Sequence, residues 1–205
     1  MDYKNLIQRS LVSLFFIILY IMIGITNQYY LFYLILFFYI LVIYEIIIYF
    51  KKILLISSYV FFSFFVFTYY FNSYFDYMFF NLFILTIVCF DVFSYILGAI
   101  FGKRKLLPKI SPNKTWSGLV SGLLFSNFLS LSYVLIFYEL SFYYVIFINL
   151  VIAFSFFGDI IQSYFKRISK IKNSSNLIPG HGGFFDRIDS FILSVYILLA
   201  FNLIK

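Results

Sequence analysis

Polar residues that could do chemistry are concentrated in residues 158–190, which read GDIIQSYFKRISKIKNSSNLIPGHGGFFDRIDS. This stretch holds three of the eight acidic residues, the single histidine, five of the fifteen Lys and Arg residues and four of the nine glycines. Carboxylates bind Mg²⁺, basic side chains neutralise phosphate oxygens, and a glycine turn brings backbone N–H groups close to them. The combination predicts a site for a polyphosphate with a divalent metal ion.

The positions of these residues favour a site over a plain connector. Asp159 follows Gly158 at the end of an apolar run, where an ionisable group is costly. Lys166 comes seven residues later, on roughly the same face if a helix continues. Residues 179–183 form a proline-glycine turn around His181. A solvated connecting loop would explain the charged residues. It would not explain why Asp159 lies at the border of an apolar run or why the glycines are so dense.

The composition indicates what kind of protein carries this stretch. The chain is 64% hydrophobic and 11% charged, whereas soluble domains are about a quarter charged. We therefore expect an integral membrane protein. The net charge of +7 does not indicate a nucleic-acid partner, because the basic residues lie in short loops between apolar runs. The N-terminal apolar run lacks a small-residue cleavage site, so we expect a retained helix.

Seven apolar runs are long enough to cross about 30 Å of hydrocarbon as helices. They are Ser10–Thr26, Tyr29–Phe50, Ile53–Phe71, Met78–Phe101, Gly118–Tyr138, Phe142–Ile161 and Ile188–Ile204. The predicted fold is an all-α polytopic membrane protein with seven transmembrane helices in one membrane domain, residues 1–205.

The basic residues predict the orientation of these helices. With a cytoplasmic N-terminus, every Lys and Arg except Lys205 falls on the cytoplasmic side, as the positive-inside rule requires. Residues 102–117 and 162–187 then face the cytoplasm, and they contain all three prolines, so we expect them to have a defined non-helical shape. Asp91 lies deeper and should face the protein interior or a polar cavity. Glu45 is expected near the membrane interface.

Residues 91–190 resemble the phosphatidate cytidylyltransferases, or CDP-diacylglycerol synthases. The long loop is similar to the family signature in GD-I-x-x-S-x-x-KR followed by K-N-x-x-x-L-I-PGHGG-x-x-DR-x-DS. Residues 110–118, ISPNKTWSG, resemble its I-S-P-x-K-T-x-E-G segment. Asp91, Tyr95 and Gly98 resemble its D-x-x-A-Y-x-x-G helix, with Ser94 in place of the Ala. Two ordered motifs at matching separation argue against chance, while residues 1–90 match only as hydrophobic spans.

The resemblance implies transfer of a cytidylyl group from CTP to phosphatidate, with Mg²⁺ as cofactor, in a bacterial inner membrane. It implies metal binding by Asp159 and Asp186. The catalytic residues expected are Asp159, Asp186, Asp189, Lys166 and Arg167. The substrate-binding residues expected are Asp91, Ser111, Lys114, Thr115, Lys172, His181, Gly182, Gly183 and Arg187. A second cation and the oligomeric state, a homodimer included, stay open.

Several alternatives also stay open. Asp189 could bind metal or hold Arg187, residues 111–115 could form only a structured turn, and the basic side chains could bind anionic lipid. Two positions depart from the family pattern by losing a carboxylate, Asn173 and Ser117. The chain could therefore be a weakened or silent family member, or a CTP-dependent transferase or kinase acting on another lipid. A transporter is disfavoured because only Asp91 is ionisable near the midplane.

Overall fold

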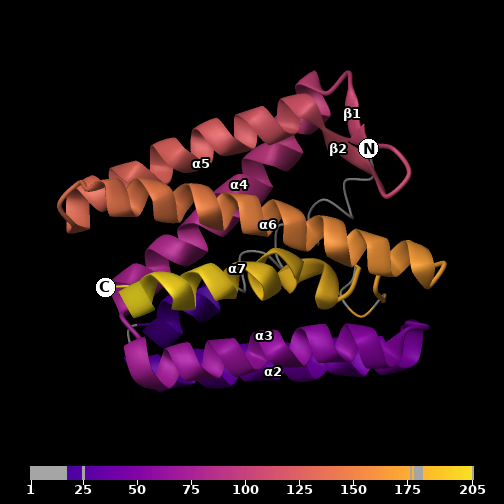
Figure 1. The fold of residues 1–205 in the computed structure, drawn as a ribbon, viewed down its shortest axis with the longest axis horizontal. Helices are drawn as coiled ribbons and strands as arrows, with labels where there is room; N and C mark the ends of the chain where they lie inside the picture. The colour runs from indigo at the N-terminus through magenta and orange to yellow at the C-terminus, as the bar shows by residue number, and fades with distance from the viewer. Residues whose placement is uncertain (1–17, 25, 176, 178–181, 205) are drawn as a thin grey trace. The chain divides into compact units, whose positions relative to one another are not determined.

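The computed structural model describes residues 18–24, 26–175, 177 and 182–204. Six helices in these ranges are long and apolar enough to cross a membrane (Figure 1). They are α2 (Gln28–Tyr49), α3 (Ile53–Tyr74), α4 (Tyr77–Phe101), α5 (Trp116–Phe137), α6 (Phe142–Ile168) and α7 (Phe185–Ile204). The prediction of an all-α polytopic membrane protein is confirmed.

The six predicted spans that begin at Tyr29 or later match these helices to within three residues at every end but one. The exception is α6, which continues past Ile161 because a helix needs no apolar residues beyond the hydrocarbon, and its last turns contain good helix formers. It ends where Lys170 adopts φ 60° and Ile171 N–H donates to Lys166 O at 3.0 Å. The first predicted span, Ser10–Thr26, lies mostly outside the described residues.

The chain divides into two compact units. The first comprises Met1–Thr68 and Phe165–Ile188, and the second comprises Tyr69–Tyr164 and Asp189–Lys205. The single membrane domain that the sequence predicts, residues 1–205, stays a prediction.

In the first unit, aromatic side chains join α2 to α3. The rings of Phe32 and Phe67 stack with centroids 6.1 Å apart, and the hydroxyl groups of Tyr39 and Ser63 share a buried hydrogen bond of 2.6 Å. Buried polar groups in a membrane protein need such partners, because hydrocarbon offers none. The pair therefore fixes how α2 and α3 face each other.

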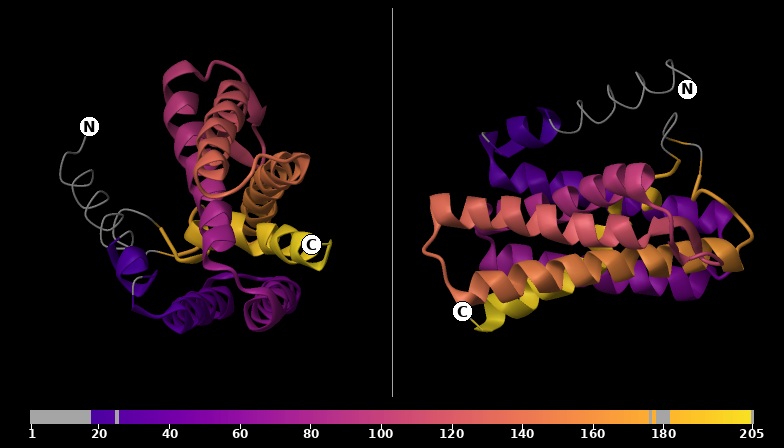
Figure 2. Two further views of the ribbon diagram at one scale, coloured as in Figure 1. Left: turned by 90° about the vertical axis from the view of Figure 1, so that its left-hand side faces the viewer. Right: turned by 90° about the horizontal axis from the view of Figure 1, so that it is seen from above.

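In the second unit, α4 and α5 lie side by side (Figure 2). Small residues form a buried stripe along α5 at every fourth position: Gly118, Gly122, Ser126 and Ser130. A Cβ atom on Gly118 would lie 2.6 Å from the carbonyl oxygen of Ser94. Small residues let two membrane helices approach this closely, so the stripe sets the α4–α5 contact.

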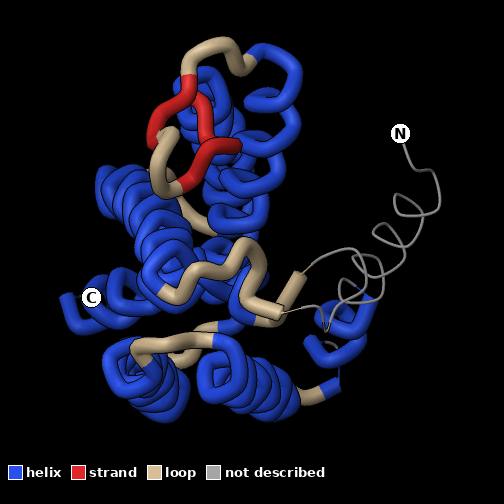
Figure 3. The backbone as a smooth tube through the Cα atoms, turned by 90° about the vertical axis from the view of Figure 1, so that its right-hand side faces the viewer, coloured by secondary structure: helices blue, strands red, loops and turns tan. Residues whose placement is uncertain are grey.

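A β-hairpin connects α4 to α5 within the segment predicted to have a defined shape (Figure 3). Strand β1 (Lys105–Leu107) pairs antiparallel with β2 (Ser111–Thr115), with Lys105 opposite Thr115. Thr115 then caps α5, because its Oγ1 accepts a hydrogen bond of 3.2 Å from Gly118 N–H. The hairpin thus positions Lys114 immediately before a helix.

Gly158, the residue before Asp159 on α6, also makes a close contact with a neighbouring helix. A Cβ atom on Gly158 would lie 2.6 Å from the carbonyl oxygen of Asp189 and 3.3 Å from Leu193 Cβ, both on α7. Glycine therefore allows α6 and α7 to pack tightly at this level. That contact brings Asp159 within reach of α7.

Candidate functional site

Hydrogen-bonded polar side chains form two clusters, one in each unit. The helix cluster, in the second unit, consists of Asp91, Lys114, Asp159 and Ser190. The loop cluster, in the first unit, consists of Glu45, Lys166, Ser174, Ser175 and Asp186. Five predicted site residues therefore fall in two separate groups: Asp91, Lys114 and Asp159 in the helix cluster, and Lys166 and Asp186 in the loop cluster.

Ser190 bridges the two carboxyl groups of the helix cluster. Its Oγ lies 2.9 Å from Asp159 Oδ1 and 3.0 Å from Asp91 Oδ2. A hydroxyl group has one proton and can donate to only one acceptor at a time. The cluster therefore offers more acceptor oxygens than Ser190 can serve, and Asp91 faces a polar interior as predicted.

Lys114 supplies the positive charge of this cluster. Its Nζ forms an ion pair with Asp159 Oδ2 and lies over the ring of Phe156, 5.0 Å from the centroid. The ring adds a cation–π attraction that holds the ammonium in place. The side chains of Lys114 and Asp159 are 22% and 21% exposed, so the pair is accessible to a ligand.

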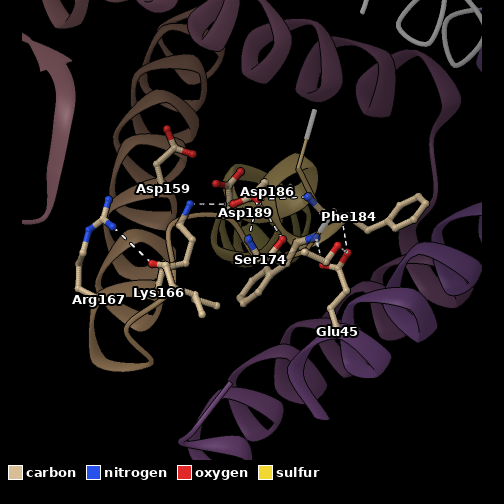
Figure 4. A network of polar contacts seen from close by, with 12 residues as sticks. Glu45, Asp159, Lys166, Arg167, Ser174, Phe184, Asp186 and Asp189 are labelled. Atoms are coloured by element: carbon tan, nitrogen blue, oxygen red, sulfur yellow. Dashed lines mark hydrogen bonds and ion pairs between the residues drawn. The ribbon is translucent and has the colours of Figure 1, made fainter. Parts of the chain in front are cut away.

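Asp186 is the centre of the loop cluster, seen in Figure 4. Its Oδ1 accepts a hydrogen bond from Lys166 Nζ at 2.7 Å. Its Oδ2 accepts from Ser174 N–H at 2.9 Å, Ser174 Oγ at 3.0 Å and Gly183 N–H at 3.2 Å. Asp186 therefore joins the end of α6 to the loop that precedes α7.

The two glycines of the turn that the structure describes have specific backbone or packing demands. Gly182 has φ +81°, a region that side chains other than glycine rarely adopt. A Cβ atom on Gly183 would collide with Ser174 Oγ and lie 2.5 Å from Glu45 Oε1. Contacts therefore shape the backbone at residues 182 and 183, while their predicted role in binding phosphate stays a prediction. His181 lies outside the described residues.

Glu45, like Ser174, Ser175 and Ser190, belongs to a cluster but was not predicted as a site residue. It lies in α2, outside the motifs, and was predicted only to be near the interface. Its side chain is completely buried and accepts hydrogen bonds from Ser175 Oγ, Phe184 N–H and Phe185 N–H. The signal was available in principle, since a lone carboxylate in an apolar helix needs buried partners.

The remaining charged residues that were predicted are not members of either cluster, although Asp189 contacts the helix cluster through Ser190. Arg167, Lys172 and Arg187 are exposed, and Arg167 Nη1 donates to Ile171 O at 3.4 Å. Asp189 Oδ1 accepts from the neighbouring Ser190 N–H at 3.0 Å. Their assigned roles stay predictions.

Residues 111–117 have structural roles that the sequence left as an alternative. Ser111 begins β2 and is half-buried. Thr115 caps α5, and its hydroxyl lies 3.3 Å from that of Ser117. Ser117, one of the two departures from the family pattern, is therefore part of the helix start. Asn173, the other departure, is exposed.

The donor atoms suit Mg²⁺, which prefers oxygen ligands and commonly takes one or two carboxylates together with substrate phosphates. Asp159 and Asp186 are each partly exposed and each already paired with a cation. Within the described residues, no group of three His, Cys, Asp or Glu side chains could hold a metal ion by itself. A metal here would need oxygens from elsewhere, such as phosphate.

Comparison with known proteins agrees with these motifs. A model described as "Cytidylyltransferase family" matches residues 5–204. The chain is 43% identical over 120 residues to a phosphatidate cytidylyltransferase of Rickettsia bellii, covering 55% of this chain and 52% of that protein. It is 42% identical over 113 residues to that of Haemophilus influenzae (51% and 38%). For Bacillus subtilis the identity is 39% over 115 residues (54% and 43%). The chain spans about half the length of the curated relatives it matches or less.

Proposed function

Because the chain belongs to the cytidylyltransferase family, we propose that it is a phosphatidate cytidylyltransferase. It would transfer the cytidylyl group of CTP to phosphatidate and release pyrophosphate. The observation that carries the proposal is the pair of lysine–carboxylate contacts, Lys114 with Asp159 and Lys166 with Asp186. All four residues fall in segments that resemble this family.

The reaction fits a site without a strong general base. Phosphatidate carries its own nucleophile, a phosphate monoester whose second pKa is about 6, so it is largely deprotonated at neutral pH. A phosphate oxygen attacks the α-phosphorus of CTP, and the bond from that phosphorus to the bridging oxygen breaks. The protein must hold two polyanions together and stabilise the charge of the in-line transfer.

The two lysine–carboxylate pairs would serve this requirement. Lys114 and Lys166 are cations already held in place, one by Asp159 and the other by Asp186. Phosphate oxygens would pair with these ammonium groups in place of the carboxylates. The carboxylates would then be available to bind a divalent cation. The family resemblance implies that Asp159 and Asp186 each bind Mg²⁺, which would neutralise phosphate charge.

Gly182 and Gly183 would let the backbone approach phosphate closely, and the Gly183 N–H, now donated to Asp186 Oδ2, would become available once that carboxylate binds the metal. Gly182 has the positive φ that helps successive N–H groups form an anion-binding concavity. The exposed basic side chains of Arg167, Lys172 and Arg187 would attract anionic substrates. His181, Asp189 and Ser111 keep the roles that the family resemblance implies.

The proposal extends to location. The protein is an integral membrane protein with six described candidate spans. The positive-inside distribution favours a cell membrane with the N-terminus and both polar loops in the cytoplasm. CTP would arrive from the cytoplasm and phosphatidate from the bilayer; a homodimer is compatible with this, and nucleic acid is not an expected partner.

The direct test is purified protein with CTP, Mg²⁺ and phosphatidate, with CDP-diacylglycerol measured by chromatography. Asp159→Asn and Asp186→Asn should each reduce the rate by about 10²-fold or more, the usual loss when a charge-stabilising group of a transition state is removed. Glu139→Gln, an exposed site outside both clusters, is the matched control and should keep its activity. If neither the wild type nor the control variant makes CDP-diacylglycerol, the proposal is rejected.

A further inference from the structure

Glu45 accepts three hydrogen bonds, two from the loop that precedes α7 and one from the first residue of α7 (Figure 4). Oε1 accepts from Ser175 Oγ at 2.6 Å and from Phe184 N–H at 2.8 Å. Oε2 accepts from Phe185 N–H at 3.0 Å. The side chain is completely buried, and its helix, α2, lies outside the segment with the family motifs.

These contacts make Glu45 the cap of α7. Phe185 is the first residue of that helix, and the first N–H groups of a helix have no partner within it. A carboxylate at this end also interacts favourably with the helix dipole. Most helices take such a cap from their own chain neighbours, whereas α7 receives it from another helix.

The side chains around Glu45 are closely packed. Gly183 fits between Glu45 and Ser174, and a Cβ atom there would meet both side chains. Phe38 of α2 packs against Phe184 with ring centroids 5.8 Å apart, and Phe50, the residue after α2, packs against Phe185 at 5.6 Å. The backbone of residues 182–185 is therefore fixed from the α2 side.

We propose that Glu45 is a positioning residue for the transfer reaction. It holds residues 183–185, and the next residue is Asp186, whose carboxylate holds Lys166 and Ser174. Its hydrogen bonds would thus set where Asp186 and the glycine turn present their groups to phosphate. The catalytic part of this inference rests on the proposed function, but the structural part does not.

The test compares Glu45→Gln with Glu45→Leu. Gln keeps the shape of Glu but replaces one acceptor oxygen with a donor NH₂ group, so one of the three donors loses its partner. Leu removes all acceptors at similar volume. Glu139→Gln, the same chemical change at an exposed position, is the control.

Two readouts separate the structural and catalytic parts. Hydrogen exchange by mass spectrometry should show peptides covering residues 182–187 exchanging at least about tenfold faster in Glu45→Leu, with Glu45→Gln between it and the wild type. The kcat for CDP-diacylglycerol formation should fall by about tenfold or more in the same order, the rate effect of about 1.4 kcal/mol. Thermal stability of both variants is measured in parallel.

The outcomes are distinguishable. Unchanged exchange in Glu45→Leu would overturn the inference at its structural base. Faster exchange with unchanged kcat would overturn the positioning role. If both variants are globally unfolded and lose kcat equally, the effect of Glu45 is not local, and this result would also contradict the positioning role. If the wild type makes no CDP-diacylglycerol, the proposed function fails, while the exchange measurement still decides whether Glu45 holds the start of α7.

Discussion

Lys114 and Asp159 are 45 residues apart in sequence, and Lys166 and Asp186 are 20 apart. The motifs predicted all four as site residues, but they did not predict which lysine meets which carboxylate. Sequence spacing gave Asp159 and Lys166 a common face of α6, yet each pairs with a residue from another segment. Pairing depends on how the segments pack, and one sequence does not contain that information.

Removing the Lys166 charge tests the pairing at the residue scale. Lys166→Gln should lower kcat/KM for CTP by about 10²-fold, because a desolvated charge contact to phosphate is lost. Lys170→Asn is the control: Lys170 is exposed and lies outside the family motif, and Asn tolerates its positive φ. Both are measured as initial rates over a range of CTP concentrations. A similar loss in both variants would show that only general surface charge matters.

At the scale of elements, hydropathy predicted the described spans closely because membrane thickness sets their length. It did not predict the hairpin, whose strands contain Pro112, Lys114 and Ser111 and show no regular alternation of apolar residues. It also missed the small-residue stripe on α5, since spacing at every fourth residue is meaningful only when a partner helix is known. For Glu45, a lone carboxylate in an apolar helix signals buried partners, but those partners lie 130 to 140 residues away in the sequence, so their identity could not be predicted.

The stripe makes a prediction about stability. Gly122→Leu should destabilise the protein by about 1–3 kcal/mol, the usual cost of overpacking, because a Cβ atom there already collides with the Ser94 hydroxyl and contacts Phe90. Val120→Leu adds volume at an exposed position of the same helix and should have little effect. Thermal unfolding of detergent-purified protein measures both. Equal melting temperatures for Gly122→Leu and the wild type would contradict the close α4–α5 contact.

At the scale of the whole molecule, the distribution of Lys and Arg predicts the orientation in the membrane. The loop residue Lys109 and the residue Glu139 are both exposed and lie at opposite ends of α5. In a background with the buried Cys89 replaced by Ser, Lys109→Cys should react with an impermeant maleimide only after cells are opened. Glu139→Cys should react in intact cells. The reverse pattern would invert the proposed topology.

The proposed function requires that the chain transfers the cytidylyl group, not the terminal phosphate, of CTP to a membrane lipid. CTP labelled with ³²P at the α-phosphate and CTP labelled at the γ-phosphate separate these reactions in one experiment with phosphatidate, a lipid alcohol and Mg²⁺. We predict that the α label enters the lipid fraction as CDP-diacylglycerol and the γ label leaves as pyrophosphate. Entry of the γ label into lipid, with no α label there, would contradict the account and identify a CTP-dependent lipid kinase.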